Sequence, residues 1–176
     1  MNFKQALYTE IDKLVNIKNF DIQSFYYNFR RMVNNINKFH NKIGKNAKNT
    51  RELSRIQYDI PVAKKPKEGQ VAYCFIEHSY PKEIFNSHWC LILKDLGNIM
   101  VVVPLTSIKE DSNLVDKERE MIIKVKKFED DGCSKLKINQ IFSADLMRID
   151  TSKKVYDLQT DFIYIKSNIK KILNLD

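Results

Sequence analysis

The stretch 86-NSHWCLILKDLGNIMVVVPLTSIK-109 gives the clearest structural signal in the chain. Two apolar, strand-like runs flank the turn-forming sequence Asp95-Leu96-Gly97-Asn98, which predicts a β-hairpin. In such a hairpin the start of the first strand lies beside the end of the second. His88 opens the first run, and Thr106 and Ser107 close the second. We therefore expect these polar side chains at one rim of the sheet.

The sequence on both sides of this hairpin predicts further strands. The runs 71–78 and 120–128 are apolar or alternate in polarity, and 134–149 contains a strand and a bend. Apolar residues from Leu158 to Ile172 recur at spacings of four and three, which is typical of a helix. Closely spaced strands followed by a helix indicate an α+β fold built on a small antiparallel β-barrel or curled sheet.

Two amphipathic helices are predicted before the sheet. Apolar residues recur at helical spacing over 3–17, and again from Phe25 to Ile43 after Asp21, a plausible N-cap. We expect an antiparallel helical hairpin that buries its aromatic stripe against the rest of the chain or a second subunit. The sequence predicts three parts: a helical hairpin extension (1–44), a basic linker (45–68) and a barrel domain (69–176).

Composition and charge narrow the function classes. The chain has 176 residues and 43% hydrophobic residues, enough for one domain with a small appendage. No apolar run approaches the length of a membrane span, and the N-terminus does not read as a secretory signal, so we expect a cytoplasmic protein without a membrane partner. The net charge is +8, and residues 1–70 hold 14 Lys+Arg against 6 Asp+Glu. This basic segment either attracts nucleic acid or an acidic partner, or is an ordinary solvated helical face.

The cysteines and histidines do not predict a metal or cofactor site. The three cysteines lack CxxC spacing, and the histidines at 40, 78 and 88 have no ligand spacing, so we expect neither a metal nor an organic cofactor. A papain-like cysteine hydrolase is a further interpretation, because a histidine also opens an apolar strand there. Cys74 lies in a strand pattern, however, and such enzymes place the nucleophile at a helix N-terminus.

The predicted rim carries groups suited to acid–base chemistry on an anion. A histidine exchanges protons near neutrality. The hydroxyls of Thr106 and Ser107 and the ammonium of Lys109 can donate to an oxyanion or a phosphate. The alternative is a strand-end histidine beside an ordinary polar turn.

Three motifs, in this order, make residues 69–176 resemble the MazF/PemK-type endoribonuclease toxins. The stretch 83–89 followed by CLILK is similar to the family's E-x-x-G-x-R-P loop and its following strand. Val103-Pro104-Leu105-Thr106-Ser107 matches V-P-x-T-S/T, and 134–148 is similar to S-x5-Q-I-R-T-I-D-x-x-R. The segment 106–109 also resembles the T-S-x-K stretch of ToxN-like toxins.

The resemblance implies a fold and an activity. It implies a small SH3-like barrel with a C-terminal helix, a homodimer, and metal-independent cleavage of single-stranded RNA through attack of the ribose 2′-OH. Thr106 matches the family's catalytic threonine directly, and Ser107 follows it. His88 stands where the family has an arginine, so a group that can be neutral replaces a permanent cation. Lys109 is then expected to supply the missing fixed charge.

The resemblance also implies an RNA-binding set and a partner. The expected RNA-binding residues are Glu83, Lys109, Ser134 and Gln140. Aromatic residues are expected to stack bases or to pack in the core: Tyr73, Tyr80 and Trp89. The expected partner is a cognate antitoxin, a protein in preference to an RNA. The alternative function is a non-catalytic SH3-like barrel that binds RNA or a protein partner.

Overall fold

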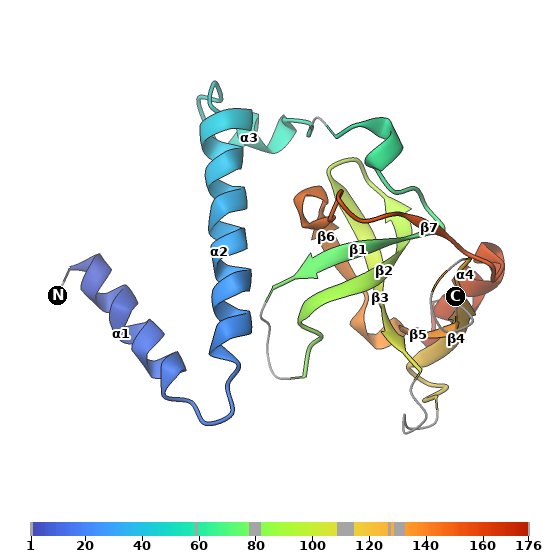
Figure 1. Ribbon diagram of the computed structural model, residues 1–176. Coiled ribbons are helices and arrows are strands. Elements are labelled where there is room, and N and C mark those ends of the chain that lie inside the picture. Colours follow the sequence, from blue (N-terminus) through green and yellow to red (C-terminus); the bar gives the residue numbers. More distant parts are fainter. Residues whose placement is uncertain are drawn as a thin grey trace.

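The computed structural model describes residues 2–58, 60–77, 82–108, 115–126, 128 and 133–175. It shows an α+β chain in which N-terminal helices precede a curled antiparallel half-barrel sheet and a C-terminal helix (Figure 1). The strands are β1 (Gln70–Ile76), β2 (Asn86–Asp95), β3 (Ile99–Ser107), β4 (Glu120–Lys124), β5 (Cys133–Lys137), β6 (Phe142–Asp145) and β7 (Tyr156–Asp157). Their order in the sheet is β4-β5-β3-β2-β1-β7, and β6 pairs with β3 outside this path.

The predicted hairpin is confirmed as β2–β3. Its register runs from Cys90↔Pro104 to Asp95↔Met100, with an irregularity between Ile92 and Lys94. The turn depends on Gly97, whose φ of 91° is a conformation that glycine adopts readily. The Gly97 N–H donates to the Asp95 carboxylate at 2.9 Å and fixes the turn.

Apolar side chains fill both faces of the central strands because successive residues of a strand point to opposite faces. One core cluster includes Leu91, Val103 and Leu136, and is closed by Ile165 and Ile169 of the C-terminal helix α4 (Phe162–Ile172). The other cluster lies on the opposite face of the same strands and consists of Ala72, Cys74, Ile76, Cys90, Ile92, Met100, Val102, Ala144, Leu146 and Ile149.

The C-terminal half differs from the expectation in two places. Helix α4 begins at Phe162, not near Leu158, because the Asp161 carboxylate caps it by accepting from the Tyr164 N–H at 2.7 Å. Leu158 instead forms a β-bridge with Val125 that ties the chain after β7 to the end of β4. The stretch 134–149 is also divided: a 3-10 turn at Ile138–Gln140 separates β5 from β6.

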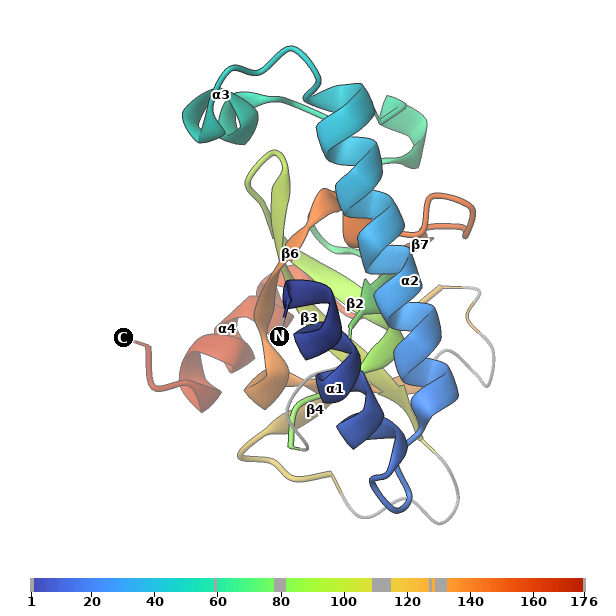
Figure 2. The same ribbon diagram turned by 90° about the vertical axis from the view of Figure 1, so that its left-hand side faces the viewer.

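Both N-terminal helices are confirmed, and a short third helix follows them. They are α1 (Phe3–Val15), α2 (Ile22–Lys38) and α3 (Thr50–Arg55). Asp21 caps α2 by accepting from the Ser24 N–H at 2.9 Å, and the last turn, Phe39–Ile43, is a π-helix. Helix α2 stands beside the sheet, whereas α1 diverges from it and buries no residue (Figures 1 and 2). The expected burial of the aromatic stripe is therefore incomplete: Phe29 is 36% exposed.

Within the described segments, none of the helices combines the length and the apolar composition that crossing a bilayer requires.

Candidate functional site

A cavity of about 380 Å³ opens at the end of β2, β3 and β5. It brings together four of the predicted site residues: His88, Thr106, Ser107 and Ser134. The β2–β3 pairing begins at Cys90↔Pro104, so His88 and Thr106 each lie two residues beyond this pair, on the same side of their strands. The residues that line the cavity are Tyr73, Ser87, His88, Trp89, Leu105, Thr106, Ser107, Ile108, Phe128, Cys133 and Ser134.

The strand geometry divides the two hydroxyls of β3 between opposite faces. Consecutive side chains of a strand point in opposite directions, so the hydroxyls of Thr106 and Ser107 lie on opposite faces of the sheet. Thr106 is opposite Lys135 in the β3–β5 register, and Ser107 is opposite Ser134. The expected catalytic group is thus split: His88 and Thr106 share one face, and Ser107 belongs to the other.

The Ser107 face of the cavity combines hydroxyls with aromatic rings. Ser134 is only 3% exposed, so its hydroxyl is directed into a largely closed environment. Trp89 lies edge-on to Tyr73 and to Phe128, with 5.1 Å between ring centroids in both pairs. Aromatic walls accept flat ring systems, and serine hydroxyls can both donate and accept hydrogen bonds. This part of the cavity suits a planar heteroaromatic group such as a nucleobase.

The imidazole of His88 is held by two backbone carbonyls. Its Nε2 lies 3.0 Å from the Phe85 oxygen, and its Nδ1 lies 3.4 Å from the Leu105 oxygen. A neutral imidazole has one N–H, which the shorter contact to Phe85 uses best. In that tautomer Nδ1 carries the lone pair and lies beside the Leu105 carbonyl oxygen of β3. A doubly protonated ring would donate to both carbonyls and would have no lone pair to offer.

Lys135 was not predicted as a site residue. It is the cross-strand neighbour of Thr106 and is 8% exposed, which is deep burial for a lysine. Directly opposite side chains have Cβ atoms about 5 Å apart, so Lys135 and Thr106 are cross-strand neighbours, although Lys135 is not among the residues that line the cavity. Its only signal in the sequence is its place in the alternating run SKLK, which alone predicts a solvated lysine.

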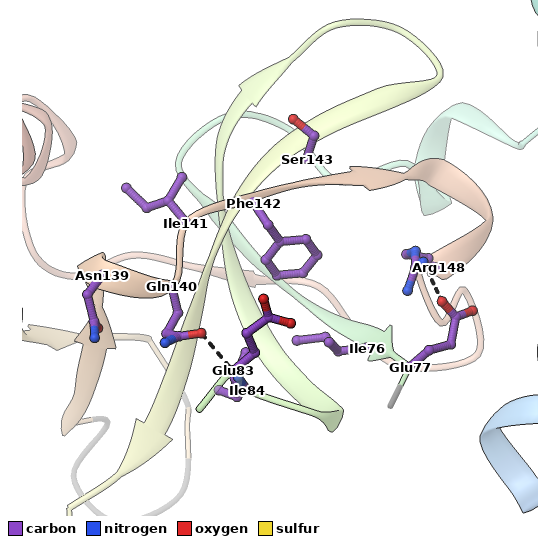
Figure 3. Close-up of a pocket in the computed structure, with 10 residues that line it drawn as sticks. All are labelled: Ile76, Glu77, Glu83, Ile84, Asn139, Gln140, Ile141, Phe142, Ser143 and Arg148. Atoms are coloured by element: carbon purple, nitrogen blue, oxygen red, sulfur yellow. Dashed lines mark hydrogen bonds and ion pairs between the residues drawn. The ribbon is translucent and has the colours of Figure 1, made fainter. Parts of the chain in front are cut away.

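Two of the expected RNA-binding residues lie at a different cavity. Glu83 and Gln140 line a space of about 410 Å³ between the start of β2 and the chain around β6 (Figure 3). The Gln140 side chain accepts from the Ile84 N–H at 3.1 Å and donates to the Lys82 carbonyl at 3.3 Å. It therefore holds the segment before β2 in place. The predicted grouping of Gln140 with Ser134 in one RNA groove is not what the geometry shows.

An ion pair closes the far side of this second cavity. The guanidinium of Arg148 contacts the Glu77 carboxylate (Figure 3), and it also donates to the Phe75 carbonyl at 3.4 Å. Both groups thereby tie the end of β1 to the turn after β6. Lys109 and Tyr80, two further predicted residues, lie outside the described part of the chain.

The two buried thiols, Cys74 and Cys90, do not form a nucleophilic site, whereas Cys133 lines the cavity. Cys74 and Cys90 are 0% exposed in β1 and β2. Burial raises the pKa of the Cys90 thiol, and the neighbouring Cys74 adds to this effect. Cys74 lies in a strand and not at a helix N-terminus, so the cysteine-hydrolase interpretation finds no support.

Over the described ranges, no group of three or more His, Cys, Asp or Glu side chains is arranged to hold a metal ion. No protein-family model matches the chain, and no curated protein matches it either.

Proposed function

We propose that this protein is a metal-independent endoribonuclease of the MazF/PemK type, built on an SH3-like barrel, and the toxin of a toxin–antitoxin system. One observation carries the proposal: His88 and Thr106 line the same cavity as a group of aromatic rings and two serine hydroxyls, those of Ser107 and Ser134. Groups that can move a proton and bind a phosphate therefore lie beside a place for a base. The curled half-barrel sheet with its C-terminal helix is compatible with this fold.

In the proposed mechanism, a nucleobase lies against the aromatic cluster around Trp89 and hydrogen-bonds to Ser107 and Ser134. The adjacent phosphate then lies at the rim, where the Thr106 hydroxyl donates to a non-bridging oxygen. Nδ1 of His88 accepts the proton of the 2′-OH. The 2′-oxygen bonds to phosphorus and the bond to the 5′-oxygen breaks, which leaves a 2′,3′-cyclic phosphate. Proton return from the imidazolium gives the 5′-OH.

Fixed positive charge is also needed, because the phosphorane carries more negative charge than the phosphodiester. This chain has His88 where the family has an arginine, so one permanent positive charge is missing. We assign this charge to Lys135, the cross-strand neighbour of Thr106. Lys109 was expected in this role from the sequence, and Glu83 and Gln140 would bind RNA from the second cavity.

A second candidate function follows from the two carbonyl contacts of His88. A ring whose two nitrogens both stay on backbone carbonyls has no nitrogen free to accept the proton of the 2′-OH. The protein would then be a non-catalytic SH3-like barrel that binds RNA or a protein partner.

Incubation of the purified chain with single-stranded RNA in EDTA separates these functions. The nuclease gives fragments with 2′,3′-cyclic phosphate and 5′-OH ends, and His88→Ala and Thr106→Ala lower the cleavage rate by about 100-fold or more, the scale of losing one oxyanion donor. His40→Ala is the matched control, because His40 lies at an exposed position outside the cavity. RNA that is bound but not cut by the native chain would favour the second candidate.

Expression in cells tests the wider assignment. A cytoplasmic toxin with these properties arrests growth, and a cognate protein antitoxin relieves the arrest. The family resemblance further implies a homodimer, which sedimentation of the purified chain would show.

A further inference from the structure

Helix α2 faces the sheet with its polar side. Ser24 and Asn28 both hydrogen-bond to the side chain of Asn86 at the start of β2, the latter at 3.0 Å. One turn later, the guanidinium of Arg31 lies 3.8 Å from the ring centroid of Phe75. These contacts use positions at helical spacing on one face of α2. An amphipathic surface helix normally turns its whole apolar face inward. Here only one margin of that face lies beside the rest of the chain, where Phe39 packs edge-on to Tyr58.

The other margin of the apolar face is left on the surface as a stripe. Phe29 is 36% exposed, Val33 44% and Ile36 51%. The wider stripe continues through half-buried residues at its margin, Phe25 and Met32. Helix α1 does not cover it, because α1 diverges from α2 (Figures 1 and 2) and exposes its own Phe3 and Leu7.

The spacing of the stripe identifies a helix as the shape that fits it. From Phe25 to Ile43, apolar residues recur at four, three, four, three and four. This spacing is that of the a and d positions of helices that pack against a second helix, and its part before Phe39 is the part that does not pack on Tyr58. A groove for an extended strand or a flat ring would not require this period.

The charge of α2 indicates the charge of the helix that would bind to the stripe. Residues 22–43 contain Arg30, Arg31, Lys38 and Lys42 and no acidic residue. Arg30 is exposed and lies one turn before Val33, so it borders the stripe. A second copy of α2 would bring two purely basic helices together, which is unfavourable. An acidic helix would be attracted along its length.

We propose that the stripe of Phe29, Val33 and Ile36 is the docking site for an acidic amphipathic helix of another protein. The partner lays leucine- or isoleucine-type side chains against the stripe and places carboxylates beside Arg30. This inference does not depend on RNA cleavage, because neither α2 nor its stripe contributes to the cavity around His88.

The test uses the full chain and a synthetic peptide of about four heptads with Leu at a and d and Glu at e and g. Fluorescence anisotropy of the labelled peptide should show saturable binding that weakens as salt is added. The same peptide with Lys in place of Glu should bind at least about tenfold more weakly. Phe29→Ser combined with Ile36→Ser should weaken binding of the Glu peptide at least about tenfold, a loss of about 1.4 kcal/mol. Arg30→Glu should weaken it as well.

Tyr27→Ser is the matched control, because Tyr27 is 64% exposed on another side of α2. It should bind the Glu peptide as the native chain does, and circular dichroism should show the same helix content in all variants. The proposal is overturned if the native chain does not bind the Glu peptide, if the Lys peptide binds equally well, or if the Phe29/Ile36 variant binds unchanged. Displacement of the peptide by single-stranded RNA would assign this face to nucleic acid. A dimer that only the Phe29/Ile36 variant loses would assign it to a second copy.

Discussion

Ser107 of β3 lies directly opposite Ser134 of β5, and the preceding residue, Thr106, lies opposite Lys135. Two neighbouring hydroxyls in the sequence therefore belong to two different environments. The Ser107 environment contains the aromatic rings of the cavity, whereas the Thr106 environment contains His88. This separation makes distinct predictions for the two hydroxyls.

Thr106→Ala should lower the rate of RNA cleavage at saturating RNA by about 100-fold, because Thr106 is proposed to contact the phosphate in the transition state. Ser107→Ala should mainly raise the RNA concentration needed for half-maximal rate, since Ser107 is proposed to bind the base. Single-turnover and steady-state kinetics separate these effects. Equal losses in the maximal rate for both variants would contradict the division.

The attachment of α2 should depend on Arg31. Its guanidinium lies over Phe75, and such a contact is worth about 0.5–2 kcal/mol. Partial burial lowers the pKa of Arg31, and the attraction of Glu77 opposes this. Arg31→Met should speed amide hydrogen exchange in α2, while exchange in β2 and β3 stays unchanged. Arg30→Met is the control, and an equal effect from it would show that α2 is not held through Phe75.

The Lys65–Asp95 ion pair should make stability depend on pH in the acid range. Lys65 Nζ lies 2.9 Å from the Asp95 carboxylate, and each side chain is about 30% exposed. Partial burial acts to raise the pKa of Asp95, but hydrogen bonds from Lys65 and the Gly97 N–H outweigh it and lower the pKa. A lowered carboxyl pKa contributes stability that is complete above the unfolded value of about 3.9 and is lost as the pH falls through the folded value.

Asp95→Asn should therefore lower the free energy of unfolding by up to about 1 kcal/mol at pH 7, a small effect because the pair is accessible to solvent. The difference between the variant and the native chain should shrink below about pH 4. Urea unfolding at several pH values measures both. A difference that stays constant down to pH 2 would show that Asp95 acts only through its turn geometry.

Gly69→Ala should destabilise the fold more than Gly97→Ala. Both glycines have positive φ, 79° and 91°, so both substitutions carry a backbone cost of about 1–2 kcal/mol. At Gly69 the new methyl group would also lie 3.3 Å from the Phe162 ring, whereas at Gly97 the nearest atom would be 3.9 Å away. Thermal unfolding should show a lower midpoint for Gly69→Ala. Equal midpoints would mean that α4 can shift away from the new methyl group without a loss of stability.

The sequence alone determined the local elements. The turn at Gly97 between two apolar runs predicted the β2–β3 hairpin, and Asp21 predicted the start of α2. Both predictions rest on interactions within a few residues, where capping and φ preferences leave few alternatives. The placement of His88 and Thr106 at one rim follows from the same hairpin, so it too was accessible from the sequence.

Which face of each element contacts the rest of the chain depends on the tertiary structure. The helical spacing of α2 marked an apolar stripe, but it did not say that the polar face would dock on Asn86. Likewise, the pattern around Lys135 did not reveal its burial opposite Thr106, and the match at Gln140 did not show that its side chain would hold the segment at Ile84. Such features depend on register and contact between segments distant in the sequence, which periodicity within one segment does not specify.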